Sequence, residues 1–168
     1  MFFLLTHPFF KKLYDECFDP LRTYLFYRSG DEALATDICQ DVFLRVWKRK
    51  PDLSWDQLRG LLYKMAKDQY VDWLRKEQVG QAHLETLSFR WNNQDPQAQL
   101  ELNELKLRYE ASLAQLPEHQ RTVYLMNRKD GLTYKEIAQR LNLSIKTIEK
   151  RMRVALQTLK KQLQDGTA

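Results

Sequence analysis

Apolar residues recur every three or four positions along most of the 168-residue chain, as they do on the buried face of an amphipathic helix. Neither half shows the strict alternation or the turn signals that are typical of β-strands and hairpins. Between the two halves, residues 79–99 have no sustained period, and their Asn, Gln, Asp and Pro residues favour a loop. The sequence therefore predicts an all-α fold of two small helical modules, residues 1–78 and 104–168, joined by a flexible linker over 79–103.

The segment LTYKEIAQRLNLSIKTIEKRM, residues 132–152, predicts two helices that meet at a tight turn. Thr133 and Glu136 have the spacing of a capping box, Asn142 can adopt the left-handed conformation that ends a helix, and Ser144 can cap the next one. At about 100° per residue, one side of the second helix is apolar: Ile145, Ile148, Met152, Ala155, Leu159 and Leu163. The opposite side is basic: Lys146, Lys150 and Arg153. This is the pattern of a helix-turn-helix, whose second helix enters the major groove of DNA, but an ordinary helical hairpin with a solvated lysine face shares it.

The net charge of +5 lies entirely in the C-terminal part of the chain. Residues 1–100 contain 14 Lys and Arg and 14 Asp and Glu, whereas residues 101–168 contain 13 and 8. Between 142 and 161, six basic residues are opposed by Glu149 alone. A local basic excess indicates a polyanionic partner, although a well-solvated helix face is the commoner origin of lysine-rich surface. Charge alone leaves both interpretations open.

The segment ATDICQDVFLRVW, residues 35–47, carries two distinct faces. Helical spacing predicts a core stripe: Leu34, Ile38, Val42 and Val46. A second face combines acidic groups with an apolar residue that would be exposed: Asp37, Gln40, Asp41 and Leu44. Such a mixed patch can dock a protein partner, and a solvated acidic stripe is the alternative.

The segment SWDQLRGLLYKMAKDQYVDWLRK, residues 54–76, predicts a long helix that begins with a second capping box, Ser54 and Gln57. The residues expected to face inward are Leu58, Leu62, Met65, Gln69 and Trp73. Tyr63, Lys67 and Tyr70 share a flank of this helix, with Lys64 and Arg75 close by. Aromatic rings stack on unpaired bases while cations follow the phosphates, so this flank can hold single-stranded nucleic acid. Burial of the tyrosines in the core is the alternative.

The remaining composition restricts the class of protein further. No stretch approaches the roughly 18–20 consecutive apolar residues of a membrane span, so no membrane insertion is expected. The apolar start, MFFLLTHPFF, lacks a basic region and is interrupted at Pro8, so it is interpreted as structure and not as a signal peptide. Two cysteines and three scattered histidines indicate neither a disulfide framework nor a metal site, and a reducing cytoplasm is the expected compartment. No catalytic constellation and no cofactor motif is present.

Taken together, these segments resemble the bacterial sigma factor family over nearly the whole chain. Residues 9–78, with DICQDVFLRVW and LRGLLYKMAKDQYVDWLRK in order, look like the second region of sigma factors, and residues 113–163 look like the fourth. The intervening third region is absent, which is similar to the extracytoplasmic-function (ECF) group. The resemblance implies a factor that binds core RNA polymerase, directs it to promoters and stabilises the opened strand. A stand-alone helix-turn-helix regulator, or an enzyme with an unrecognised site, is the alternative.

The resemblance also implies roles for particular residues. Contact with the clamp helices of core polymerase is implied for Asp37, Gln40, Asp41 and Leu44. Capture of the melted minus-ten element is implied for Tyr63, Lys64, Lys67 and Asp68, and Tyr70 and Arg75 flank them. Reading of the minus-thirty-five element is implied for Ile145, Lys146, Thr147, Glu149, Lys150, Arg151 and Arg153. The polymerase flap region and an anti-sigma factor are further partners that it suggests. Where the family often has Asn, this chain has Asp68, which can accept a hydrogen bond from cytosine N4 but repels phosphate.

Overall fold

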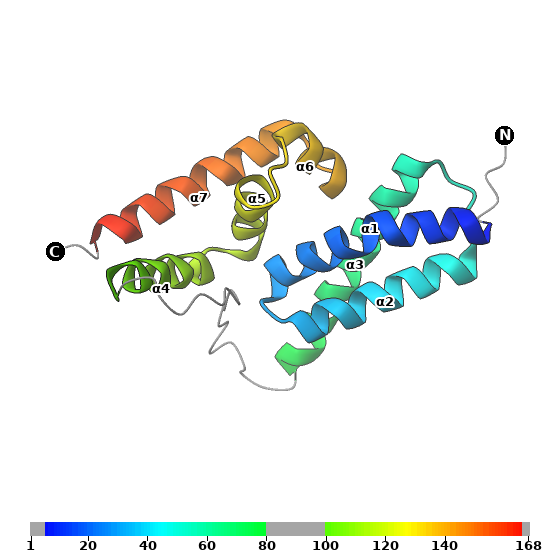
Figure 1. Ribbon diagram of the computed structural model, residues 1–168, viewed down its shortest axis with the longest axis horizontal. Helices are drawn as coiled ribbons and strands as arrows, with labels where there is room; N and C mark the ends of the chain where they lie inside the picture. The colour runs from blue at the N-terminus through cyan, green and yellow to red at the C-terminus, as the bar shows by residue number, and fades with distance from the viewer. Residues whose placement is uncertain (1–5, 80–99, 166–168) are drawn as a thin grey trace.

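The computed structural model of the chain describes residues 6–79 and 100–165, and every regular element in these residues is an α-helix (Figure 1). The helices are α1 (His7–Ser29), α2 (Glu32–Arg49), α3 (Trp55–Val79), α4 (Leu100–Gln115), α5 (Glu118–Arg128), α6 (Tyr134–Leu141) and α7 (Ile145–Asp165). Helices α1 to α3 form the N-terminal module and α4 to α7 the C-terminal one. The all-α expectation is confirmed.

The N-terminal module is built around helix ends that local sequence determines. Gly30 ends α1 in the left-handed conformation, φ 71°, and its N–H donates to the Phe26 carbonyl at 2.8 Å. Asp31 then caps α2 by accepting from the Leu34 N–H at 3.0 Å. The capping box of Ser54 and Gln57 is present at the start of α3. Of the expected α2 core stripe, Ile38, Val42 and Val46 are buried and Leu34 lies half-buried at its edge.

The helix-turn-helix of the C-terminal module forms as its sequence predicts. The Thr133 hydroxyl and the Glu136 carboxylate make the reciprocal capping box, and Asn142 ends α6 at φ 52°. Ser144 accepts from the Thr147 N–H at 3.1 Å at the start of α7. The apolar side of α7 is buried from Ile148 to Leu159. Ile145, the first residue of α7, is 46% exposed.

The module boundary differs slightly from the expected one. Helix α4 begins at Leu100, four residues before the C-terminal module was expected to start. Most of the expected linker, residues 80–99, lies outside the described residues.

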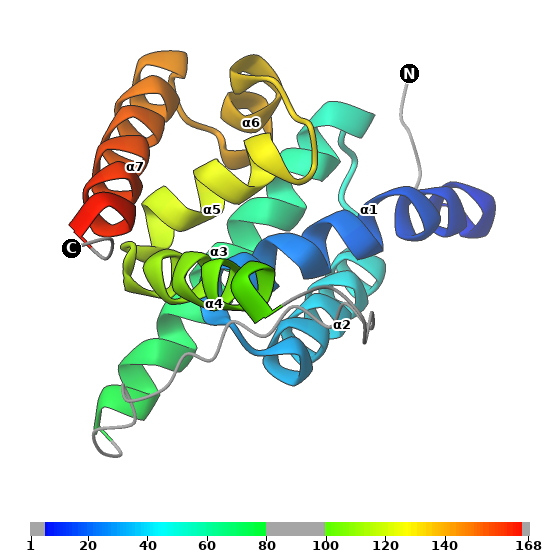
Figure 2. The ribbon, with the colours of Figure 1, turned by 60° about the vertical axis from the view of Figure 1, so that its left-hand side comes forward.

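The two modules pack directly against each other. Helix α5 lies against α1, and α6 lies against α3 (Figure 2). The buried side chain of Arg121, on α5, donates from Nε to the Tyr27 carbonyl and from Nη2 to the Arg28 carbonyl, each at 2.9 Å. These carbonyls belong to the last turn of α1, where no intrahelical N–H reaches them. An arginine of one module therefore caps a helix of the other.

Candidate functional site

The mixed acidic face of α2 is exposed and lies off the core stripe, as expected. All four of its residues reach solvent: Asp37, Gln40, Asp41 and Leu44. Leu44 is 48% exposed, and it is one of six large apolar side chains that are exposed in the described residues. This face is therefore open to a partner or to solvent, as both interpretations of the sequence require.

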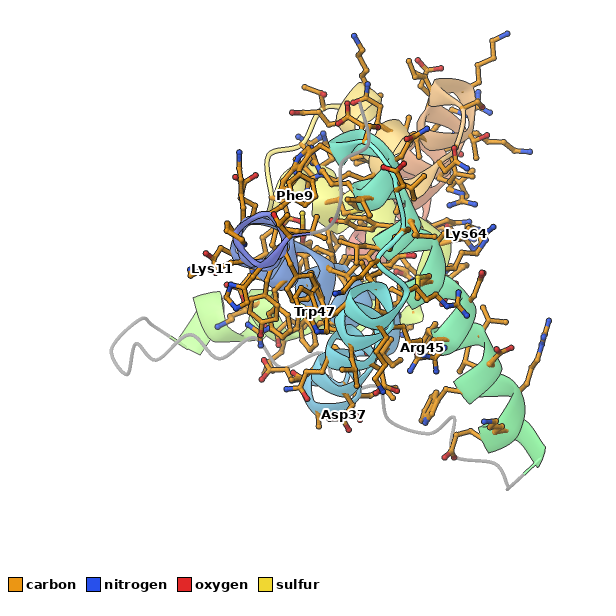
Figure 3. The ribbon with its side chains drawn as sticks, turned by 90° about the vertical axis from the view of Figure 1, so that its right-hand side faces the viewer. Phe9, Lys11, Asp37, Arg45, Trp47 and Lys64 are labelled. Atoms are coloured by element: carbon orange, nitrogen blue, oxygen red, sulfur yellow. The ribbon has the colours of Figure 1, made fainter. Side chains whose placement is uncertain are left out.

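A groove of about 760 Å³ runs along one side of this face, between α2 and α3. Its α2 wall includes Asp37, Gln40, Asp41 and Arg45, and its α3 wall includes Asp68, Asp72 and Trp73. The Gln69 amide donates to the Asp41 carboxylate at 3.0 Å, so the two walls are joined by a hydrogen bond. In Figure 3, Arg45 lies on the α3 side of α2, whereas Trp47 lies on the side of α1.

A second groove, of about 420 Å³, lies on the other side of α2, against α1. It is lined almost entirely by apolar and aromatic side chains: His7, Phe10, Tyr14, Gln40, Phe43, Leu44 and Trp47. The Phe10 and Trp47 rings lie 4.7 Å apart between centroids. Gln40 lines both grooves, so the acidic face forms a ridge between a polar groove and an apolar one.

The aromatic flank of α3 differs from its expected arrangement. Tyr63 is 4% and Tyr70 is 5% exposed, so neither ring offers a face to a base in this arrangement of the modules. Tyr63 packs on Tyr24 with ring centroids 5.1 Å apart, and the Tyr70 hydroxyl donates to the Arg28 carbonyl at 3.2 Å. Burial raises the pKa of both tyrosines to about 12. Periodicity alone could not identify this flank as buried, because the covering groups come from α1 and from Arg140 on α6.

The other residues expected to contact the minus-ten element are exposed, as that role requires. Trp73, which was expected to face inward, is exposed as well. The exposed members are Lys64, Lys67, Asp68 and Arg75. Lys64 projects from the side of α3 that faces away from α2 (Figure 3). Trp73 is 36% exposed and lies nearly parallel to the Tyr70 ring, at 15°. The predicted inward face of α3 therefore ends at Gln69, which is half-buried.

The basic face of α7 divides into two parts. Ile145, Lys146, Glu149, Lys150 and Arg153 are exposed, and Thr147 is half-buried beside the Ser144 cap. Arg151, in contrast, lies half-buried in a small pocket between the modules that Arg28, Lys67 and Glu118 also line. Burial lowers the pKa of Arg151 from its ordinary value, and the neighbouring Arg28 adds to the effect. Of the basic residues expected to contact DNA from α7, the exposed ones in this arrangement are therefore Lys146, Lys150 and Arg153.

The contacts between the modules involve residues that sequence reasoning missed. Arg28 pairs with Glu118, and the Tyr27 hydroxyl donates to the Asp130 carboxylate at 2.5 Å. Arg121 is 1% exposed. One sequence signal for Arg121 exists, because it precedes Leu125 by four residues and so lies in the apolar register of α5.

The described part of the chain contains neither a metal site nor a membrane span. In residues 6–79 and 100–165, no group of His, Cys, Asp and Glu side chains is arranged to hold a metal ion. Within the same ranges, no helix combines the length and apolarity that a membrane span requires.

Comparison with known protein families gives two matches in one chain. Sigma-70 region 2 matches residues 13–79, and sigma-70 region 4 matches residues 106–159. The matched segments are the two modules seen in the structure, in the order that the family has them.

Individual proteins similar to this chain are sigma factors as well. The ferric citrate uptake sigma factor FecI of Escherichia coli (strain K12) is 32% identical over 139 residues, which cover 81% of this chain and 80% of the relative. The ECF RNA polymerase sigma factor SigX of Bacillus subtilis (strain 168) is 31% identical over 150 residues, covering 80% and 73%.

Two solved structures share the fold. The sigma factor RpoE of Bartonella quintana, solved with the anti-sigma factor NepR, has a TM-score of 0.65 at 20% identity and covers 92% of this chain and 96% of its own. CnrH, solved with the cytosolic domain of CnrY, has a TM-score of 0.61 at 21% identity, with coverage of 97% and 92%.

Proposed function

The chain belongs to the sigma-70 family, in its extracytoplasmic-function group, and on that basis we propose which of its residues act in transcription initiation. As a sigma factor it associates with core RNA polymerase and directs it to specific promoters for initiation. The observation that carries this conclusion is the presence of both regions, in order, in one chain. The alternative of a stand-alone helix-turn-helix regulator is not favoured, because it does not account for region 2 over residues 13–79.

Sigma factors are regulatory subunits, and we propose that this chain supplies no catalytic group of its own. The polymerase performs phosphodiester chemistry, while this chain contributes binding, recognition and strand capture. Because bacterial RNA polymerase works in the cytoplasm, the cytoplasm is the proposed location.

The exposed face of α2 is the proposed contact with the polymerase clamp helices. Asp37, Gln40, Asp41 and Leu44 present carboxylates around an accessible apolar side chain, and none of them is buried in the module's own core. Charged groups at such an interface determine the partner and its register. The flap region of polymerase is the proposed contact of the C-terminal module.

Promoter contacts are proposed for the exposed basic residues of both modules. Lys146 and Lys150 lie near the N-terminus of α7, where a recognition helix meets base edges, and Arg153 favours phosphates. In the N-terminal module, Lys64 and Lys67 are the proposed contacts with the melted minus-ten strand, with Asp68 beside them.

Use of the tyrosine flank requires movement between the modules. Tyr63 and Tyr70 lie buried where α5 and α6 cover α1 and α3, so base stacking on either ring requires the C-terminal module to move away. Region 4 must also reach a promoter element distant from the one that region 2 holds. An anti-sigma factor is a proposed partner, since the structural neighbour RpoE of Bartonella quintana was solved with the anti-sigma factor NepR.

The test of the function is transcription by core polymerase supplemented with the purified chain. We expect transcripts from a defined set of promoters that core polymerase alone does not use, and co-purification of the two proteins. Asp41→Lys reverses a charge at the proposed clamp contact, which can cost roughly 2–5 kcal/mol at a desolvated interface. Asp52→Lys, in an exposed loop away from the α2 face, is the matched control. DNA binding without any association with polymerase would replace this function with that of a stand-alone regulator.

A further inference from the structure

Trp73 is an exposed aromatic side chain for which the proposed contacts give no role. It is 36% exposed on α3, and its ring lies nearly parallel to that of Tyr70, 15° between planes and 6.2 Å between centroids. The buried Tyr70 ring lies alongside the indole in an offset stack, while about a third of Trp73 still meets solvent. A rigid, partly exposed tryptophan in a groove is the kind of residue that anchors protein interfaces.

The groove that contains Trp73 is continuous with the acidic face of α2. Asp37, Gln40 and Asp41 form its α2 wall, and Asp72 and Trp73 belong to its α3 wall. The hydrogen bond from Gln69 to Asp41 joins the two walls at 3.0 Å, so Asp41 is held by α3 and not only by its own helix. A partner that contacts Asp37, Gln40 and Asp41 therefore meets the α3 wall as well.

The groove has a small excess of negative charge, four carboxylates against three cations, which favours a basic protein partner over nucleic acid. Four carboxylates line it: Asp37, Asp41, Asp68 and Asp72. Its cations are Arg45, Arg49 and Lys76, and the one ion pair found for a groove carboxylate in the described residues is the exposed contact of Asp72 with Arg75 at 3.4 Å. Nucleic acid phosphates would meet Asp37, Asp41 and Asp72 with like charge, whereas a helix carrying Lys or Arg beside an apolar residue would not. Asp68 belongs instead to the proposed minus-ten contact.

We propose that the groove between α2 and α3 is part of the polymerase-docking surface, with Trp73 as its apolar anchor and Asp72 as a charge partner for a basic helix of polymerase. This inference rests on the proposed function, because it assigns the α3 wall of the groove to the same partner that is proposed to contact the exposed face of α2. In this proposal α3 contacts DNA on its Lys64 side and protein on its Trp73 side.

The test measures affinity of the full chain for core polymerase in the absence of promoter DNA. We expect Trp73→Ala to weaken binding about tenfold or more, as truncation of an interface anchor does. Asp72→Lys should weaken it as well, and this variant keeps the core intact because Asp72 is exposed. Asp52→Lys is the matched charge reversal outside the groove and should bind as the unaltered chain does. Circular dichroism of each variant confirms that it is folded.

The outcomes separate this inference from the function on which it rests. If the unaltered chain does not bind core polymerase at all, the proposed function fails. If the chain binds and Asp41→Lys weakens it, but Trp73→Ala and Asp72→Lys retain full affinity, the function stands and the inference is overturned. A change in minus-ten preference with unchanged polymerase affinity would likewise overturn it, because Trp73 would then face DNA.

Discussion

Arg121 of α5 donates its Nε–H to the backbone carbonyl of Tyr27, at the end of α1, over 2.9 Å. Its other guanidinium nitrogens reach three further carbonyls, those of Arg28, Ala114 and Leu116. One side chain thus satisfies acceptors in both modules while it is almost fully buried. Removal of a group that satisfies buried acceptors costs more than the bonds themselves contribute, because a carbonyl left without another donor remains desolvated and unpaired. The Arg28 carbonyl keeps the Tyr70 hydroxyl as a donor, so the cost falls mainly on the other carbonyls.

We expect Arg121→Ala to lower the free energy of unfolding by roughly 2–4 kcal/mol, since each buried carbonyl left unpaired costs about 1–3 kcal/mol. Chemical denaturation followed by circular dichroism measures the change. Arg128→Ala, at an exposed position of the same helix, is the control and should change little. An equal effect of the two substitutions would contradict a role of Arg121 in joining the modules.

The burial of Tyr63 leads to a prediction about stability and not only about DNA. Tyr63→Ala should lower the free energy of unfolding by roughly 3–5 kcal/mol, the range for truncation of a buried aromatic ring. Tyr63→Phe keeps the ring and should cost much less. Urea denaturation of both variants checks the difference. Normal stability of Tyr63→Ala would mean that the ring is not part of the core in solution.

The exposed basic face of α7 should contain two functional classes. Lys146→Ala or Lys150→Ala should cost roughly 1–3 kcal/mol on the preferred minus-thirty-five sequence and relax discrimination there, because these side chains are placed to reach base edges. Arg153→Ala should weaken preferred and scrambled sequences alike and reduce the salt dependence, as loss of a phosphate contact does. Polymerase loaded with each variant is measured on both promoter fragments over a range of salt. Uniform losses from all three would assign the whole face to phosphate contacts.

The two cysteines provide a probe of core packing. Burial raises the pKa of Cys39 to about 12, and it raises that of Cys17 as well, from an ordinary value of 9.0. The Cys39 thiolate fraction near pH 8 should then be about a thousandfold lower in the folded protein, and its reaction with an aromatic disulfide correspondingly slow. Because the folded pKa is raised, the associated stability is present below pH 9.0 and is lost as pH rises towards about 12.

The measurement uses Cys17→Ser so that only Cys39 reacts, with the urea-unfolded protein as the reference. Rapid reaction at pH 8 in the folded state would show that the thiol is reached by opening of the N-terminal module.

The sequence by itself determined the elements and their ends. Capping boxes at Ser54 and Thr133, the left-handed Asn142 and the cap at Ser144 depend on residues a few positions apart, so local chemistry is sufficient to predict them. Local sequence was also sufficient to predict that the α2 face, Lys146 and Lys150 are exposed, since each lies away from the apolar stripe of its own helix.

Only the tertiary structure decided which faces are covered by other parts of the chain. Tyr63 and Tyr70 are buried by groups from α1 and from the C-terminal module, while Trp73 is exposed although its spacing matches the inward stripe. Arg151, expected to contact DNA, lies half-buried at the contact between the modules, and Arg121, for which the sequence analysis gave no role, joins them. Helical periodicity describes one helix against one neighbour, whereas burial here depends on two modules far apart in sequence that meet across α1 and α3.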